Sequence, residues 1–222
     1  LVEQPAPAGK PPATDVRAYA LNRASRELLE SVRCWPANEA SATPVRHMQV
    51  WGDRGSELKF DAGESGSPAL TWIVDVPVLE SQLADAVRYQ PQIEVLSAPA
   101  PARLTVVCEG RTSSTRAEFG VDFEVTPYPQ HALATRLRCE RPHGQVARQW
   151  FAHGEILAFL PMDGALGNSV AIVWSVSPER AAYLQGLEAA DFCHELENTS
   201  AHMLGSLTLA SERRTWPLQK AQ

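Results

Sequence analysis

Two apolar runs near the middle of the chain constrain its fold more than any other feature. Residues 156–162 (ILAFLPM) and 169–176 (SVAIVWSV) are apolar throughout except for two serines. Runs this short, bounded by turn residues and rich in β-branched and aromatic side chains, are typical of strands buried on both faces. The sequence therefore predicts a sheet that other elements must cover.

The segments before these runs extend the same sheet. Residues 132–139 alternate in polarity, as a strand with one buried face does. Turns are expected at Pro142-His143-Gly144 and at His153-Gly154, with a strand over 146–151 between them. Residues 131–177 are therefore expected to form three or four consecutive antiparallel strands.

Amphipathic spacing and turn residues predict further elements on both sides of this sheet. Asp15 is a suitable cap for a helix over 15–32, in which apolar residues recur three or four positions apart. The tetrapeptide Gly52-Asp53-Arg54-Gly55 indicates a hairpin between short alternating runs at 45–51 and 57–60. We also expect a strand at 72–74, a helix at 75–89, a buried parallel-type strand at 104–107, helices at 178–187 and 189–198, and short strands at 204–209 and 214–218.

Charge and composition exclude several classes of function. The chain has 222 residues, a net charge of −6 and a pI near 5.5, and its 20 lysines and arginines are scattered, so no nucleic-acid partner is expected. No apolar run approaches the roughly 20 residues that a membrane helix requires. The N-terminus has no targeting pattern. We expect a cytoplasmic protein, and leave open a peripheral contact with the inner membrane or with a biosynthetic complex.

The cysteine and histidine patterns argue against metal and redox sites. The cysteines lie far apart, and the six histidines are dispersed, so we expect free thiols and no metal ion. The sequence contains no lysine-bearing phosphate loop, no nucleophile elbow and no carboxylates clustered at catalytic spacing. Catalytic side chains are therefore unknown from the sequence. The four cysteines are Cys34, Cys108, Cys139 and Cys193.

The strand segment also carries a family resemblance. The residues that carry it are Pro142-His143, Ala147, Gln149, Phe151, Leu160-Pro161 and Val173-Trp174. In these residues the segment resembles the strand signature of the FAD-dependent aromatic monooxygenases that hydroxylate ubiquinone precursors, which share the para-hydroxybenzoate hydroxylase-like fold. The resemblance implies an α/β and α+β fold, in which a partial FAD-binding (Rossmann-like) domain adjoins an antiparallel-sheet substrate domain covered by helices. A meander in some other α+β domain is the alternative.

The resemblance implies a division of the chain. Residues 1–44 and 90–120 would be remnants of the FAD-binding domain, and residues 45–89 and 121–222 would form the substrate-binding sheet domain. The family's Gly-x-Gly-x-x-Gly turn and its terminal Gly-Asp motif are absent from the sequence. We therefore expect these residues to belong to a longer enzyme, whose other segments are either removed or disordered.

Two candidate FAD-binding residues lie near the N-terminus. Glu3 stands where such folds place the carboxylate that binds the adenosine ribose, if an earlier strand precedes it. A solvated terminal residue is the alternative. Arg17, followed by Ala20-Leu21 and Ser25, is similar to the family segment whose arginine lies along the FAD pyrophosphate, a role that suits a guanidinium group. A surface arginine in a first helical turn is the alternative.

Glu109 and Gly110 are the other candidate FAD-binding residues. They follow the expected strand at 104–107 and precede Ser113 and Arg116, which resembles the family's second flavin motif. That motif usually has aspartate where this chain has Glu109. The longer side chain implies a rebuilt or water-mediated contact, and an ordinary strand followed by a polar loop is the alternative.

The resemblance implies an activity. FAD would be the cofactor and NAD(P)H the co-substrate, and an oxygen atom from O2 would be transferred to a phenol that carries an isoprenoid tail. The strands at 156–160 and 170–174 are candidates for the roof of an apolar pocket. Two alternatives stay open: a flavin-free binding or scaffold protein derived from this family, and a related flavin monooxygenase that acts on another aromatic substrate.

Overall fold

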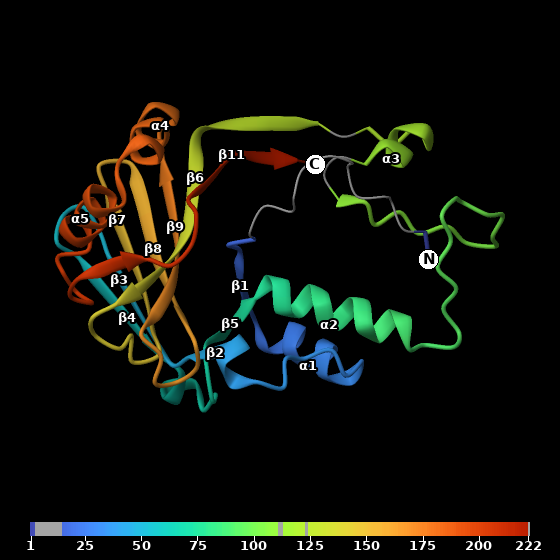
Figure 1. Cartoon of the computed structure of the whole chain (residues 1–222), viewed down its shortest axis with the longest axis horizontal. Coiled ribbons are helices and arrows are strands. Elements are labelled where there is room, and N and C mark those ends of the chain that lie inside the picture. Colours follow the sequence, from blue (N-terminus) through green and yellow to red (C-terminus); the bar gives the residue numbers. More distant parts are fainter. Residues whose placement is uncertain (3–14, 111–112, 123, 222) are drawn as a thin grey trace.

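The computed structural model describes residues 1–2, 15–110, 113–122 and 124–221. They form a mixed α/β fold with a large and a small β-sheet (Figure 1). The large sheet has eight strands in the order β10-β6-β9-β8-β7-β3-β4, with β11 also paired to β6. Its strands are β3 (His47–Trp51), β4 (Glu57–Asp61), β6 (Val125–Cys139), β7 (Val146–Ala152), β8 (Glu155–Met162), β9 (Ser169–Val176), β10 (Leu207–Leu209) and β11 (Arg214–Ala221).

The antiparallel core of the large sheet is confirmed. Strand β7 pairs with β8, β8 with β9, and β9 with β6, all antiparallel. Strands β3 and β4 form the expected hairpin, in which His47 faces Asp61 and Trp51 faces Glu57. Strand β3 runs parallel to β7, however, so the large sheet is mixed.

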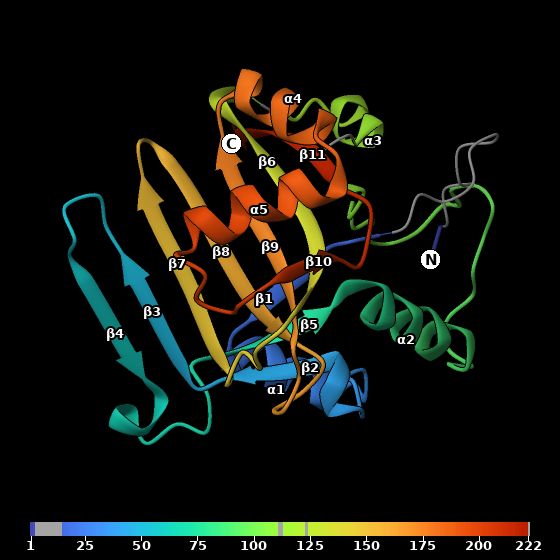
Figure 2. The same cartoon turned by 60° about the vertical axis from the view of Figure 1, so that its left-hand side comes forward.

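Two helices cover one face of the large sheet, which we call the helix face (Figure 2). They are α4 (Pro178–Gly186) and α5 (Ala189–Thr199), as the sequence predicts. Alternate residues of the apolar strands, such as Phe159 and Trp174, are fully buried beneath Leu184, Phe192 and Leu196. Burying each such side chain stabilises the fold by about 1.5–3 kcal/mol. This layer is the main core of the protein.

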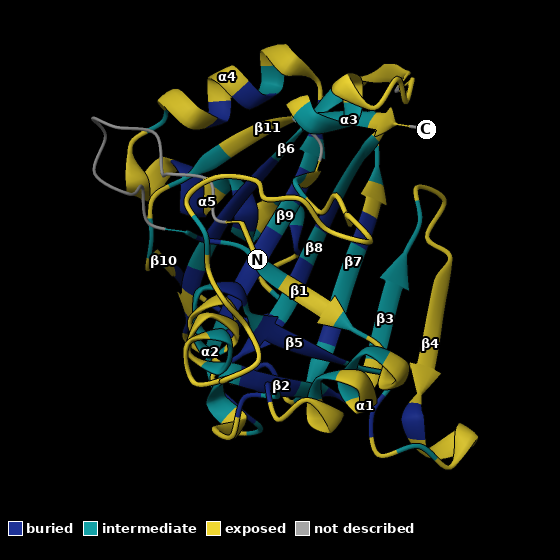
Figure 3. Cartoon of the chain, turned by 90° about the vertical axis from the view of Figure 1, so that its right-hand side faces the viewer, coloured by how far each residue is buried: buried dark blue, intermediate teal, exposed yellow. Residues whose placement is uncertain are grey.

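A three-stranded antiparallel sheet packs against the opposite face of the large sheet. Its strands are β1 (Ala18–Leu21), β2 (Ala42–Val45) and β5 (Thr71–Asp75), in the order β1-β5-β2. Val45 and Ile73 lie in the contact between the two sheets, together with Ala147, Met162 and Ala171 of the large sheet. The small sheet covers only one end of that face. We call this entire face of the large sheet, including the covered end, the open face (Figure 3).

Helices cover the outer side of the small sheet. These are α1 (Arg23–Ser31) and α2 (Val76–Arg88), whose Leu29 and Leu79 pack beside Trp72. Asp75 caps α2 by accepting from the Val78 N–H at 3.1 Å, which agrees with the helix expected at 75–89. The short helices are η1 (Glu39–Ser41), η2 (Ala62–Ser65) and α3 (Ser114–Glu118).

The prediction of one helix over 15–32 is wrong in its first half. Residues 18–21 form strand β1, and helix α1 begins only at Arg23, with the Asn22 side chain as its cap. The cause is tertiary, because Ala18 and Leu21 pair with Asp75 and Trp72 of β5. The hydrogen bonds of this ladder outweigh a local helical preference of a few tenths of a kcal/mol per residue, roughly speaking.

The strand predicted at 104–107 is also wrong. Those residues belong to none of the strands in the described part of the chain, and Leu104 and Val106 are 78% and 71% exposed. A buried parallel strand needs neighbouring strands on both sides. Within the described part of the chain only an isolated bridge between Val2 and Leu96 approaches such an arrangement.

The division into domains stays a prediction, and two pairings bear on it. Strands β1 and β2 lie within residues 1–44 but pair with β5 from residues 45–89, so these two segments share one sheet. The Leu1 amino group donates to the Glu94 carbonyl at 2.8 Å, which joins the N-terminus to residues 90–120.

The described residues can be examined for membrane-spanning helices and for metal-binding clusters. None of their helices is both long and apolar enough to span a bilayer. They also contain no cluster of three or more His, Cys, Asp or Glu side chains arranged for a metal ion. All four cysteines are free thiols, and only Cys108 is exposed.

Candidate functional site

The open face of the large sheet presents an apolar surface beyond the edge of the small sheet. Its central rows pair Ala158 with Val173 and Ile156 with Ser175. These four side chains are half-buried, whereas Leu160 of the next row packs beneath the small sheet. The strands expected to roof a pocket therefore contribute only alternate residues to it, because the others point into the helix-face core.

The apolar surface continues across β7 onto the β3–β4 hairpin. Val50 pairs with Leu58, and Phe60 pairs with Met48, which packs on the open face. Leu58, Phe60 and Phe151 are 60%, 47% and 39% exposed. Large apolar side chains gathered on one sheet face indicate a binding surface more often than isolated ones do.

Polar side chains on the same face are few. Gln149 lies in the same row as Ala158 and Val50, and Ser175 lies beside Ile156. Neither side chain has a hydrogen-bond partner among the described residues. An apolar surface with a few convergent polar groups suits a flat organic ring that carries hydroxyl groups.

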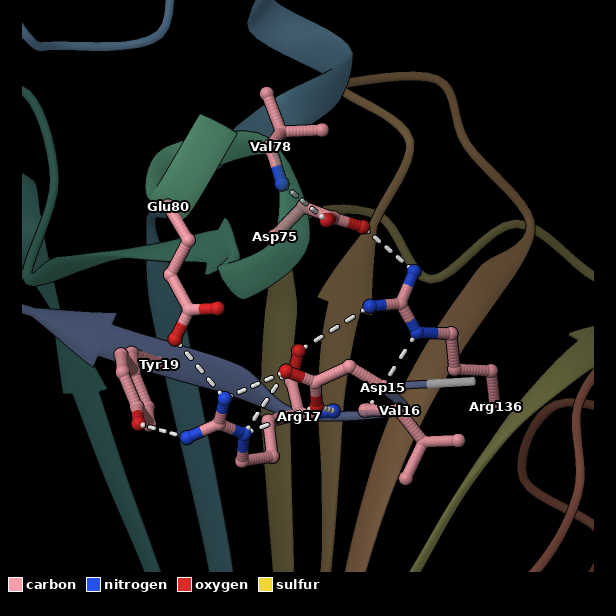
Figure 4. A network of polar contacts seen from close by, with 8 residues as sticks. All are labelled: Asp15, Val16, Arg17, Tyr19, Asp75, Val78, Glu80 and Arg136. Atoms are coloured by element: carbon pink, nitrogen blue, oxygen red, sulfur yellow. Dashed lines mark hydrogen bonds and ion pairs between the residues drawn. The ribbon is translucent and has the colours of Figure 1, made fainter. Parts of the chain in front are cut away.

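Arg17 lies just before β1, in a network of polar contacts (Figure 4). Its Nε and Nη2 atoms donate to the Asp15 carboxylate at 2.9 and 2.6 Å, and Nη2 also meets Glu80 Oε1 at 3.0 Å. Its Nη1 donates to the Tyr19 hydroxyl at 3.0 Å. The hydrogen bonds from Arg17 hold the pKa of Asp15 below its usual value, and Asp15 in turn raises the pKa of Arg17. The Arg17 guanidinium is thus already paired with two carboxylates, those of Asp15 and Glu80.

Arg136 of β6 connects the two sheets, and its role was not predicted from the sequence. Its Nη1 donates to Asp75 Oδ2 at 2.5 Å, and its Nη2 and Nε reach the Arg17 and Val16 carbonyls at 3.2 and 3.4 Å (Figure 4). Because Asp75 also caps α2, one guanidinium fastens both β1 and α2 to the open face. The only available signal was a charge on the polar side of an alternating strand.

Glu109 and Gly110 precede α3, whose N-cap is Ser113. The Glu109 carboxylate accepts from the hydroxyls of Ser113 and Thr115, both at 2.6 Å. Gly110 has a φ of 73°, and its carbonyl accepts from Arg116 Nη1 at 3.3 Å. This segment lies near the end of β11, away from β1 (Figures 1 and 3).

Of the predicted FAD-binding residues that the structure describes, Arg17 is therefore not brought together with Glu109 and Gly110. Arg17 lies beside the small sheet, and Glu109 and Gly110 lie near α3. Glu3 lies outside the described residues. The assignment of these four residues to FAD stays a prediction.

His143 is fully buried at the turn between β6 and β7. Its Nδ1 accepts from the Gln145 N–H at 3.0 Å, so the ring proton is on Nε2, which donates to the Met162 carbonyl at 2.7 Å. Burial lowers the pKa of this imidazole. His143 is thus a neutral, satisfied side chain that holds the turn.

No protein-family model matches the chain. Curated relatives are nevertheless hydroxylases of ubiquinone biosynthesis. The 3-demethoxyubiquinol 3-hydroxylase of Escherichia coli (strain K12) is 27% identical over 228 residues, which cover 92% of this chain and 57% of that protein. The ubiquinone hydroxylase UbiM of Neisseria meningitidis is 22% identical over 93% of this chain and 50% of its own length. The mitochondrial ubiquinone biosynthesis monooxygenase COQ6 of Drosophila melanogaster is 25% identical over 88% and 46%. The chain thus spans about half the length of the curated relatives that it matches.

Solved structures support the same fold. PqsL of Pseudomonas aeruginosa, a probable FAD-dependent monooxygenase, superposes with a TM-score of 0.73 at 16% identity, over 98% of this chain and 65% of PqsL. The p-nitrophenol 4-monooxygenase PnpA of Pseudomonas putida superposes with a TM-score of 0.64 at 13% identity, over 99% of this chain and 62% of PnpA. The resemblance seen in the strand motifs is thereby confirmed. By sequence the chain is similar to ubiquinone-biosynthesis hydroxylases, and its fold is similar to the folds of PqsL and PnpA.

Proposed function

We propose that this chain forms the substrate-binding part of a flavin-dependent monooxygenase that hydroxylates an aromatic, polyprenyl-phenol precursor of ubiquinone, with NAD(P)H and O2 as co-substrates. The observation that carries the proposal is the apolar open face, which stays half-buried beyond the small sheet. The names of the curated relatives support the reaction class and the substrate class.

The centre of the open face would hold the aromatic ring. Ala158 and Val173 are small enough to let a flat ring approach the sheet, and Ile156 borders them. The Gln149 amide and the Ser175 hydroxyl would orient the ring hydroxyl, since neither has another partner among the described residues. PqsL has also been solved in complex with the aromatic compound 2-aminobenzoylacetate, and that structure superposes on this chain with a TM-score of 0.71.

The β3–β4 hairpin would hold the isoprenoid tail. Leu58 and Phe60 are the most exposed large apolar side chains of the hairpin. The sheet row of Leu58 leads through Val50 and Ala158 to Val173. Phe60 lies in the adjacent row, which leads through Met48 to Ala147 at the edge of the small sheet. Lys59 pairs with Gln49 and points to the opposite face. The hairpin is therefore apolar on one side only, as the lining of a tail-binding surface should be.

A bound flavin would supply the oxygen-transfer chemistry. The residues of this chain fit the flavin ring system better than they fit its pyrophosphate. The open face fits a planar ring system. Arg17, the predicted pyrophosphate ligand, does not fit as it stands, because Asp15 and Glu80 already hold its guanidinium. We therefore assign no step to Arg17. The tasks assigned to this chain are to bind the substrate, to orient its hydroxyl group and to exclude water from the ring.

Calorimetric titration of the purified protein with a prenylated phenol tests the proposal. We expect saturable binding that is weakened about tenfold or more by Val173→Asp, because a carboxylate would replace an apolar contact with the ring. Phe60→Asp should weaken binding of the long-tailed phenol but leave a tail-free phenol unaffected. Lys59→Ala, on the opposite face of the hairpin, is the matched control and should change neither affinity.

The cofactor is tested in the same preparation. FAD is added, free flavin is removed by gel filtration, and visible flavin absorbance in the protein peak is measured. Retained flavin supports the enzyme, whereas phenol binding without flavin retention would favour the flavin-free carrier. A protein that binds no phenol contradicts the proposed site altogether.

A further inference from the structure

A second concave site lies on the far side of the small sheet from the open face. It is a groove of about 580 Å³ between the end of α1, the loop after it and strand β2. Ala42 and Trp72 face this side of the small sheet, whereas Val45 and Ile73 face the large sheet. The groove is therefore separate from the proposed substrate site.

The floor of the groove is aromatic. Trp72 is 4% exposed, and the Trp35 ring stands edge-on to it at 6.1 Å and 87°. The Arg26 guanidinium lies 4.6 Å from the Trp72 ring centroid and 5.2 Å from that of Trp35. Stacked indole and guanidinium surfaces favour a planar ligand, because both present flat, weakly hydrated faces.

The rim of the groove is positively charged. Arg26 Nε is paired with Glu30 at 2.7 Å, but Arg33 and Arg46 have no ion pair among the described residues. Among the described residues that line the groove, Glu39 is the only other one with a carboxylate. Two unpaired guanidinium groups thus face one unpaired carboxylate, on a chain whose net charge is −6. A local cationic site on an acidic protein attracts anions selectively.

We propose that this groove binds a small aromatic carboxylate. The ring lies against the half-buried Trp35 and the Arg26 guanidinium, which the buried Trp72 supports from below, and the carboxylate is bound by Arg33 and Arg46, whose planar forks match its two oxygens. A volume of about 580 Å³ is within the range of small-molecule sites. The site is independent of the proposed hydroxylase function.

Titration of the full chain with benzoate, followed by calorimetry and by tryptophan fluorescence, tests this proposal. We expect saturable binding that Arg33→Ala/Arg46→Ala weakens at least about tenfold, because charge-assisted bonds are lost. Arg88→Ala, an exposed arginine on α2, is the matched control and should bind benzoate like the wild type. Benzyl alcohol, which has the ring but no charge, should bind about tenfold more weakly or not at all.

Three results would overturn the assignment. One is unchanged benzoate binding in the double variant. Another is equal affinity for inorganic phosphate, which would mean that the aromatic floor contributes nothing. The third is loss of benzoate binding in Val173→Asp, which would move the ligand to the open face. Because Val173 belongs only to the proposed substrate site, failure of one site is distinguishable from failure of the other.

Discussion

Replacing Arg136 by methionine should destabilise the protein strongly. Arg136 and its partner Asp75 are 23% and 14% exposed, so their ion pair is largely removed from water. Methionine keeps most of the side-chain volume but leaves the Asp75 carboxylate, and the Val16 and Arg17 carbonyls, without this donor.

The magnitude follows from the burial of the pair. Removing one partner of a fully buried pair costs about 3–5 kcal/mol, and an exposed pair is worth about 0–1 kcal/mol. The residual exposure of Arg136 and Asp75 places the expected loss near the lower end of the buried range, at about 3 kcal/mol. Arg138→Met is the matched control. Its guanidinium lies on the same face two residues further on, is exposed, and makes one long contact of 3.5 Å, so we expect a change within about 0.5 kcal/mol.

Urea unfolding, followed by circular dichroism, measures both losses. Asp75→Asn closes a double-mutant cycle, because asparagine removes the charge but preserves the cap on α2. The double variant should be more stable than the sum of the single losses predicts, by about 1–3 kcal/mol. Hydrogen exchange should also accelerate in β1, which Arg136 fastens. Strictly additive losses, or equal losses for Arg136→Met and Arg138→Met, would refute the reasoning.

Three further changes have defined outcomes. His143 has a pKa below its usual value in the fold, so the unfolded chain binds the proton first as pH falls. The free energy of unfolding should therefore be constant above the ordinary histidine pKa of about 6.5 and decrease below it. A series of urea-unfolding measurements at different pH, in which His143→Gln keeps the same slope, would contradict this. Phe192→Ala leaves a cavity where the fully buried Phe192 ring fills the core between α5 and the helix face, and should lower the free energy of unfolding by about 3–5 kcal/mol. Tyr183→Ala, on the exposed side of α4, should lower it by less than about 1 kcal/mol. Asn22→Ala removes the cap of α1 and should cost about 1 kcal/mol, which Asn22→Ser should restore; equal losses would show that the 2.9 Å bond to the Ser25 N–H is not stabilising.

The sequence by itself determined the elements whose pattern is local. Two short apolar runs bounded by turn residues predicted β8 and β9, and residues 178–199 repeat with the period of a helix, so β8, β9, α4 and α5 are all where they were expected. The strand motifs also carried the family resemblance. The pattern of apolar and polar side chains is a local property of the sequence, so it predicts these elements without knowledge of their distant partners.

Tertiary contacts decided the elements whose neighbours are distant in sequence. Residues 18–21 form a strand because they pair with β5. Residues 104–107 form no strand, because no described strand flanks them. The parallel pairing of β3 with β7 is likewise invisible in a pattern that only states which residues alternate.

The candidate site divides in the same way. The apolar strands were recognisable from sequence, but which of their residues face the substrate depends on where α4, α5 and the small sheet lie. Arg17 could be identified by its motif, yet only the fold brings Glu80 within 3.0 Å of it, 63 residues away along the chain. Composition and period describe what a segment can bury. Charge pairing between remote residues depends on distances in space, and only the folded structure determines these.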